Sequence, residues 1–129
     1  MKNYTDLKTF EDACKALSLD PKKVIPDFSC YPEKDQKSMI AHSKLVIIVR
    51  AANQLANEGK EWMPDFSNWD ERKHEIWFGY DKGSSGFRCG DFALWFSASI
   101  VGSRLCFISW QVGEYIGETF IDLWNEYLL

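Results

Sequence analysis

The stretch that decides the fold is His74-Glu75-Ile76-Trp77-Phe78-Gly79-Tyr80, which is followed by the polar sequence Asp81-Lys82-Gly83-Ser84-Ser85-Gly86. Apolar and other residues alternate along the first part, and this period of two is typical of a half-buried β-strand. Glycine and serine in the second part favour a tight turn. Together they predict an antiparallel hairpin whose second strand runs over residues 87–98.

The chain beyond the hairpin predicts a third strand. The turn sequence Val101-Gly102-Ser103 leads into a short, largely apolar segment from Arg104 to Ile108. Inside the second strand we expect a bulge at Gly90, because glycine within a strand often marks one. The three segments predict an antiparallel meander.

Alternation divides the strand residues between two faces, since neighbouring side chains point in opposite directions. The apolar set is expected to be covered and comprises Ile76, Phe78, Tyr80, Phe92, Leu94, Phe96, Ala98, Leu105 and Phe107. The opposite set is mixed and comprises Glu75, Trp77, Asp91, Ala93, Trp95, Ser97, Arg104 and Cys106.

Two helices are predicted before the hairpin. Thr9-Phe10-Glu11-Asp12 has the form of a capping box, and Asp20-Pro21 should end the helix that it starts. A second helix is expected to begin near Pro32 or Glu33 and to end before Gly59, a glycine suited to the C′ position. Its second half is apolar nearly all round, which predicts a central helix that is covered on several sides.

A third helix should follow Ser109, a suitable N-cap. Its expected buried stripe is Val112, Ile116, Phe120, Leu123 and Tyr127. Glycines at 113 and 117 lower helix propensity, so we expect another backbone or the sheet to approach closely there. The whole order is α-α-β-β-β-α. It predicts one α+β domain over residues 1–129, with a three-stranded antiparallel sheet packed on one face against three helices.

Composition excludes several classes of protein. Fifteen Lys and Arg residues against nineteen Asp and Glu residues give a net charge of −4, which argues against broad binding to a phosphate backbone. Hydrophobic residues at 46% and charged residues at 26% exclude a wholly disordered or fibrous chain. The longest aliphatic run, Leu45 to Val49, is far shorter than the roughly 20 residues of a membrane span. With no secretory signal after Lys2, we predict a cytoplasmic protein without membrane association.

The cysteines give no sign of a metal centre. They are widely spaced, they form no C-x-x-C pair, and neither histidine has the spacing of a zinc ligand. We expect reduced, buried thiols and predict neither a metal site nor a cofactor.

Some stretches resemble known sequences over most of the chain. They include Thr9-Phe10-Glu11-Asp12-Ala13-Cys14-Lys15-Ala16-Leu17, Val24-Ile25-Pro26-Asp27-Phe28 and, most specifically, Val101-Gly102-Ser103-Arg104-Leu105-Cys106-Phe107. Through these residues the chain resembles a family of small uncharacterised proteins of anaerobic gut bacteria and of their phages or mobile elements. The resemblance implies a bacterial or phage cytoplasmic setting. It implies no activity and therefore assigns no site residue.

For each group of residues that could be catalytic, a purely structural role fits the sequence pattern better. Cys89, His74 and Asp91 contain the groups of a thiol hydrolase, but alternation places His74 and Asp91 on opposite faces. The turn at 82–86 lacks P-loop spacing, and the acidic residues at 114, 118 and 122 have the spacing of a solvated helix flank. We therefore predict no catalytic residue.

The candidate binding surface is the mixed face of the sheet. Tryptophan beside arginine and glutamate is typical of the hot spots of protein interfaces. Its residues are Trp77, Trp95, Arg104, Arg88 and Glu75. Two alternatives concern this face. The aromatic loop at 62–69 could fold over it as a lid, and the two arginines could form ion pairs with Glu75 or Asp91.

These observations predict a non-enzymatic module that binds an unidentified protein partner or a second copy of itself. Two other classes stay open. Aromatics on strands can stack on unpaired bases, although the net charge disfavours a nucleic-acid partner. A small enzyme would need a polar cleft with convergent groups, which no spacing in the sequence indicates.

Overall fold

The computed structural model describes the backbone of residues 1–96 and 103–129 and the side chains of residues 1–89 and 103–129. The fold class is α+β, as predicted. Helices are the 3₁₀-helix η1 (Tyr4–Asp6), α1 (Phe10–Ala16), α2 (Glu33–Ala56), α3 (Trp110–Thr119) and α4 (Ile121–Leu128). The strands β1 (Arg72–Asp81) and β2 (Gly86–Phe96) form an antiparallel hairpin.

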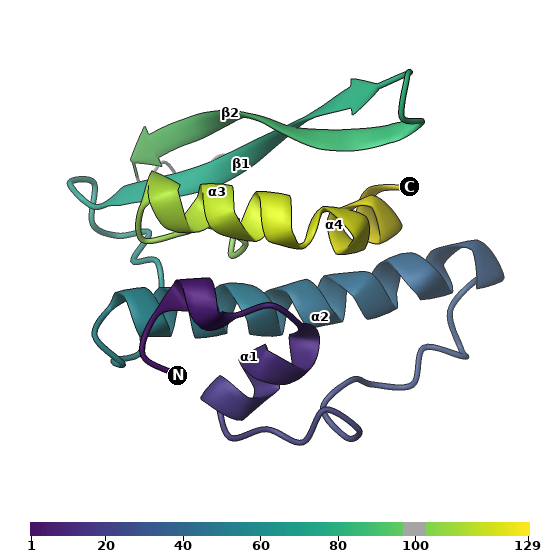
Figure 1. Ribbon diagram of the computed structural model, residues 1–129, viewed down its shortest axis with the longest axis horizontal. Coiled ribbons are helices and arrows are strands. Elements are labelled where there is room, and N and C mark those ends of the chain that lie inside the picture. The colour runs from purple at the N-terminus through teal and green to yellow at the C-terminus, as the bar shows by residue number, and fades with distance from the viewer. Residues whose placement is uncertain (97–102) are drawn as a thin grey trace.

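The elements are arranged in layers (Figure 1). The hairpin forms one layer, α3 and α4 lie beneath it, and α2 lies on the other side of α3 and α4, with α1 packed on α2. Within the described residues α3 and α4 make the main helix contacts of the strands, and α2 packs on α3 and α4 from the other side. The finer prediction, three helices on one face of a three-stranded sheet, is not shown. Gly113 and Gly117 face the sheet, while Val112 and Ile116 join the core with α2.

Close approach explains the two glycines of α3. A Cβ atom at Gly117 would lie 3.0 Å from Cys89 Sγ and 3.1 Å from Ile76 Cδ1, and one at Gly113 would lie 3.2 Å from the Phe107 ring. The expectation that these glycines admit a neighbour is confirmed, and the neighbour is the sheet with the Phe107 segment.

The predicted third strand is not a strand in the described residues. Residue Phe107 alone forms a bridge, and its partner is His74 of β1: Phe107 N donates to His74 O at 2.8 Å, and His74 N donates to Phe107 O at 3.2 Å. This bridge lies on the edge of β1 that does not pair with β2, whereas a meander would place the third segment beside β2. The opposite edge of the segment bonds with α2.

The side chain of Asn53, in α2, makes the bonds with this opposite edge. Asn53 Nδ2 donates to Cys106 O at 2.9 Å, and Asn53 Oδ1 accepts from Ile108 N at 2.9 Å. The amide thus makes the two bonds that a neighbouring strand would make. Asn53 is only 3% exposed, so the central helix is connected to the β-layer by a buried polar clamp.

The hairpin register contains the expected irregularity. Ile76 pairs with Phe92 and Phe78 pairs with Cys89, so Trp77 alone stands opposite both Gly90 and Asp91. This is the two-against-one arrangement of a bulge. It turns Cys89 toward the helices, although strict alternation would have placed that residue on the mixed face.

Helix ends follow the predicted signals with two differences. Thr9 and Asp12 form the capping box of α1, as predicted. At the end of α2 the C′ position is occupied by Glu58 (φ 58°), and Gly59 follows it (φ 80°). The third predicted helix breaks at Phe120 into α3 and α4. As a result Trp124 is buried, while Leu123 and Tyr127 are only half-buried.

Most of the predicted covered face packs as expected where it is described. The rings of Phe78 and Trp124 have centroids 4.9 Å apart, and Ile76 meets α3. Tyr80 is an exception at 53% exposure, because it lies near the hairpin turn, beyond Phe78. The side chains of residues 92, 94 and 96, and residue Ala98 altogether, lie outside the described residues.

Candidate functional site

The helix-free face of β1 changes from buried to open along the strand. Lys73, Glu75 and Trp77 are alternate residues and share this face. Lys73 is fully buried, Glu75 is half-buried, and Trp77 is 60% exposed. The face therefore has a closed end near Lys73 and an open end at Trp77.

The closed end is covered by the aromatic loop that precedes β1. Lys73 Nζ lies 3.1 Å from Glu71 Oε1, donates to the carbonyl of Asn68 at 3.4 Å, and lies 5.5 Å from the centre of the Phe66 ring. Burial of an ammonium group requires such partners. The lid alternative is thus correct for one end of the face only, because the loop does not cover Trp77.

Two acid-base groups lie under the closed end. Burial raises the pKa of Glu75, and a hydrogen bond with the Ser103 side chain acts in the opposite direction. Burial also raises the pKa of Cys106 to about 12, with the Glu75 charge as a further cause. Cys106 was placed on the mixed face and proves to be fully buried. Its thiol is therefore protonated and inert at neutral pH.

The open end consists of the Trp77 indole, the backbone of Gly79, which carries no side chain, and the Arg88–Asp81 ion pair. Gly79 follows Trp77 on the same face, and a Cβ atom there would meet nothing within 4 Å. Arg88 pairs with Gly79 across the ladder. Its Nε donates to Asp81 Oδ2 at 2.9 Å, so among the described side chains its carboxylate partner is Asp81 of the hairpin. The side chain of Asp91, one of the predicted partners, lies outside the described residues.

The five predicted binding residues are only partly brought together. Trp77 and Arg88 lie at the open end and Glu75 lies between the two ends. Arg104 is exposed and its Nη2 contacts Met63 Sδ at 3.8 Å, beside α2. The position of Trp95 is in register with Lys73, but its side chain lies outside the described residues.

The hairpin turn is held together by hydrogen bonds with the Asp81 side chain. Gly83 N donates to Asp81 Oδ1 at 3.0 Å, and Ser84 Oγ donates to Asp81 Oδ2 at 3.1 Å. The turn that we predicted at 82–86 is confirmed. Hydrogen bonds with Gly83 N, Arg88 and Ser84 hold the pKa of Asp81 below its usual range, so the carboxylate stays charged beside Arg88.

The structure does not bring Cys89 and His74 together as a nucleophile and its base. Cys89 pairs with Phe78, which is four residues from His74 along β1. Strands rise about 3.3 Å per residue, so the two positions are separated by roughly 13 Å, well beyond a nucleophile–base hydrogen bond. Burial and the charges of Glu118 and Glu114 raise the pKa of Cys89, which disfavours the thiolate. The Asp91 side chain lies outside the described residues.

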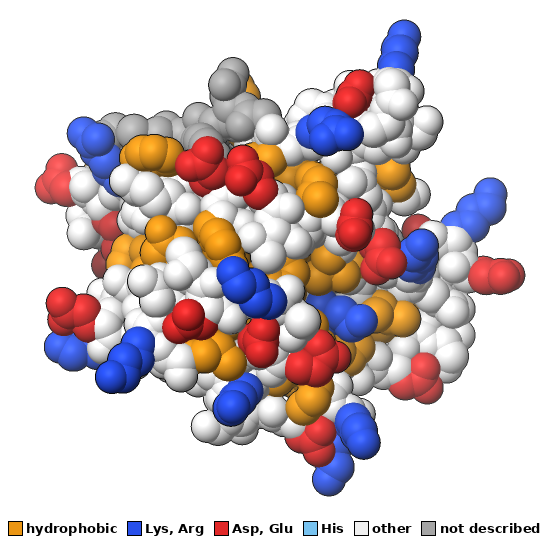
Figure 2. All heavy atoms as spheres, viewed as in Figure 1, with side chains coloured by type: hydrophobic (Ala, Val, Ile, Leu, Met, Phe, Trp, Pro, Cys, Tyr) orange, Lys and Arg blue, Asp and Glu red, His pale blue; other side chains and the backbone are white. Residues whose placement is uncertain are grey.

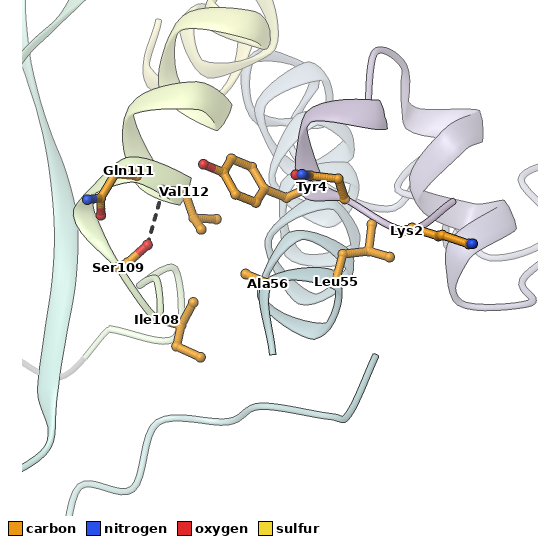
Figure 3. A pocket seen from close by; sticks show the side chains of 9 residues that line it. Lys2, Tyr4, Leu55, Ala56, Ile108, Ser109, Gln111 and Val112 are labelled. Atoms are coloured by element: carbon orange, nitrogen blue, oxygen red, sulfur yellow. Dashed lines mark hydrogen bonds between the residues drawn. The ribbon is translucent and has the colours of Figure 1, made fainter. Parts of the chain in front are cut away.

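A cavity of about 430 Å³ lies where η1, the end of α2 and the start of α3 meet (Figure 3). Its polar groups serve local structure. Asn3 Oδ1 accepts from Thr5 N at 3.1 Å, and Ser109 Oγ accepts from Val112 N at 3.4 Å. The residues that line it include no His, Cys, Asp or Glu. This cavity therefore lacks the groups of an acid–base or metal site.

Comparison with known proteins identifies no relative: the chain matches no protein-family model, no curated protein and no solved structure. The resemblance to the gut-bacterial family thus stays a prediction. None of the helices in the described ranges has both the length and the apolar character needed to span a bilayer.

Sequence reasoning missed two members of the open end. Gly79 was treated only as one residue of a strand, although a glycine inside an alternating pattern can indicate a close approach to the backbone. Asp81 was assigned to the turn, and nothing in the sequence distinguished it as the partner of Arg88. Lys73 was missed as well, because a lysine next to a strand is usually solvent-exposed.

Proposed function

We propose that the chain is a non-catalytic module that associates with a second copy of itself through the open end of the hairpin. The observation that carries this proposal is the 60% exposure of Trp77 on the face of β1 that no helix covers. An indole with most of its surface in water is costly for a monomer and supplies much of the binding energy when an interface covers it.

A second copy suits this surface because the surface is self-complementary. In a two-fold dimer each residue of the patch meets the same patch on the partner. Trp77 projects from β1, and two residues further on, about 6.6 Å along the strand, Gly79 leaves a gap. A two-fold axis near Phe78 would seat each indole over the other copy's Gly79.

An exposed ion pair lies beside the gap. Arg88 and Asp81 of the same chain are 2.9 Å apart. Because the pair is exposed and already formed within one chain, it contributes little to the affinity of the dimer.

The test is the concentration dependence of sedimentation for the full chain and for two variants. Trp77→Ala removes the projecting group and should weaken the dimer by about 30-fold, as for a hot-spot residue of about 2 kcal/mol. Gly79→Leu fills the gap and should weaken it as well, and its Cβ would meet no atom within 4 Å.

The matched control is Trp69→Ala, which removes an indole of similar exposure, 65%, from the covering loop. It should leave the dimer unchanged. A wild-type chain that stays monomeric up to millimolar concentration would overturn the proposal, and so would equal weakening by the Trp69 and Trp77 substitutions.

Binding of single-stranded nucleic acid is the second candidate, since Trp77 can stack on a base. Two observations weigh against it. Arg88 is already paired with Asp81, and acidic and basic side chains are interspersed over the face shown in Figure 2. Titration with a single-stranded oligonucleotide distinguishes the candidates, because binding that falls steeply with salt belongs to this one alone.

A further inference from the structure

Two arginine side chains converge on one methionine sulfur at a place remote from the hairpin's open end. Met63 Sδ lies 3.1 Å from Arg50 Nη2 and 3.8 Å from Arg104 Nη2. Arg50 belongs to α2, Arg104 belongs to the segment before Cys106, and Met63 belongs to the loop between α2 and β1. The sulfur thus lies at the meeting point of three parts of the chain.

This arrangement is poorly matched to a thioether. A thioether sulfur is a weak hydrogen-bond acceptor, whereas two guanidinium groups are strong, permanently charged donors. A carboxylate would normally be expected between them. The Glu61 carboxylate accepts from Arg50 Nη1 at 3.2 Å, and Arg50 Nη2 is directed at the sulfur.

A sulfoxide at the same position would satisfy both donors. Its oxygen is a strong acceptor and can take charge-assisted hydrogen bonds from Arg50 and Arg104. There is also room for it: a groove of about 30 Å³ is lined by Trp62, Met63 and Pro64 together with the two arginines and α2, and a single added oxygen needs about the space of one water molecule. Met63 is 37% exposed, so small oxidants can reach it.

We propose that Met63 is a reversible oxidation site whose sulfoxide locks the covering loop onto α2 and onto the segment before Cys106. Hydrogen peroxide is the oxidant. The sulfur lone pair attacks one peroxide oxygen, the O–O bond breaks, and a new S–O bond forms. The sulfur loses two electrons, while the other peroxide oxygen leaves and is protonated to water. The product is one methionine sulfoxide and one water molecule.

Oxidation of Met63 is expected to stabilise the loop, whereas oxidation of a methionine usually destabilises the surrounding structure. Oxidation of a methionine in a core disrupts packing, but here the added oxygen fills a groove rimmed by donors. The Arg50–Glu61 ion pair is retained because it uses a different nitrogen. Residues 62–66 should therefore open less often in the oxidised protein, and the closed end around Lys73 should be held more firmly.

The test is hydrogen exchange of the loop, followed by mass spectrometry before and after treatment with hydrogen peroxide. Thiol reductant is added afterwards, so that cysteine oxidation is reversed while sulfoxides remain. In the wild-type chain we expect amide exchange over residues 62–66 to slow by about fivefold. Treatment with methionine sulfoxide reductase should restore the original rate.

Two variants make the result specific. Met63→Leu keeps Met1 and Met39 as oxidisable residues and should show no change in loop exchange. Arg104→Gln replaces the guanidinium at an exposed site by a shorter, neutral amide and should lose most of the slowing, although Met63 is still oxidised. Faster loop exchange in the oxidised wild-type chain, or equal slowing in wild type and Arg104→Gln, would overturn the proposal.

Discussion

Replacing Asn53 by alanine tests how the α-helical and β-layers are joined. Its side-chain amide makes two hydrogen bonds of 2.9 Å, one with Cys106 O and one with Ile108 N, and it is almost completely buried. The substitution removes both bonds at once. It also leaves the Cys106 carbonyl and the partly buried Ile108 N–H group without this partner.

The magnitude follows from those two losses. Each buried group left without its hydrogen-bond partner costs about 1–3 kcal/mol, so the two together cost about 2–6 kcal/mol. Because the segment can relax and admit some water, we expect a total near the lower end, about 3 kcal/mol. For a domain of this size that corresponds to a fall in Tm of roughly 10 °C.

The assay is urea unfolding followed by tryptophan fluorescence and by circular dichroism. The matched control is Gln54→Ala, one residue along the same helix, which should lie within about 0.5 kcal/mol of wild type. An Asn53→Ala variant that is equally close to wild type would refute the clamp. It would mean that the Phe107 bridge and apolar packing suffice to hold the segment.

Three further predictions follow from local geometry. Glu58→Gly should stabilise the chain by about 0.5–1 kcal/mol, measured by the urea midpoint, because glycine adopts positive φ without strain. Burial lowers the pKa of His74, so its contribution to stability is complete above its unfolded pKa of about 6.5 and is lost as pH falls below that value through the lower pKa of the folded state. The urea midpoint should therefore decrease from pH 7 to pH 5, and less so in His74→Gln. Iodoacetamide should label exposed Cys30 first and buried Cys106, whose pKa is about 12, only after unfolding.

Elements that are determined by residues close together in the sequence were predictable from the sequence. The Thr9–Asp12 capping box, the long central helix and the hairpin each depend on residues close together in sequence, and each is present. Gly90 marked the bulge correctly. Gly113 and Gly117 indicated a close approach, since their low helix propensity needs a compensating contact.

Features that depend on distant residues were not predictable. The segment at 104–108 has the composition of a strand, but in the described residues it forms a single bridge with β1, and its opposite edge bonds with Asn53. One polar residue inside the apolar run of α2 was the available signal, and by itself it does not name a partner. The break at Phe120 likewise shifts burial from Leu123 to Trp124, because it changes the rotation of the following turn.

In the candidate site, too, features set by the strand pattern were predictable and features set by distant residues were not. Alternation placed Trp77 on the face away from the helices, and it is exposed there. Exposed cysteine was not anticipated: Cys30 lies on the surface, although we expected buried thiols. Lys73 is buried only because Glu71, Asn68 and Phe66 close over it, which depends on the path of the loop and not on the strand pattern.

Hydroxyl-radical footprinting of the full chain at low and high protein concentration tests the self-association proposal most directly, because it reports on each indole separately. If the open end of the hairpin is the contact, oxidation of Trp77 should slow as the concentration rises while oxidation of Trp69 stays constant. A chain that dimerises with Trp77 still oxidised at its dilute rate would contradict the proposal.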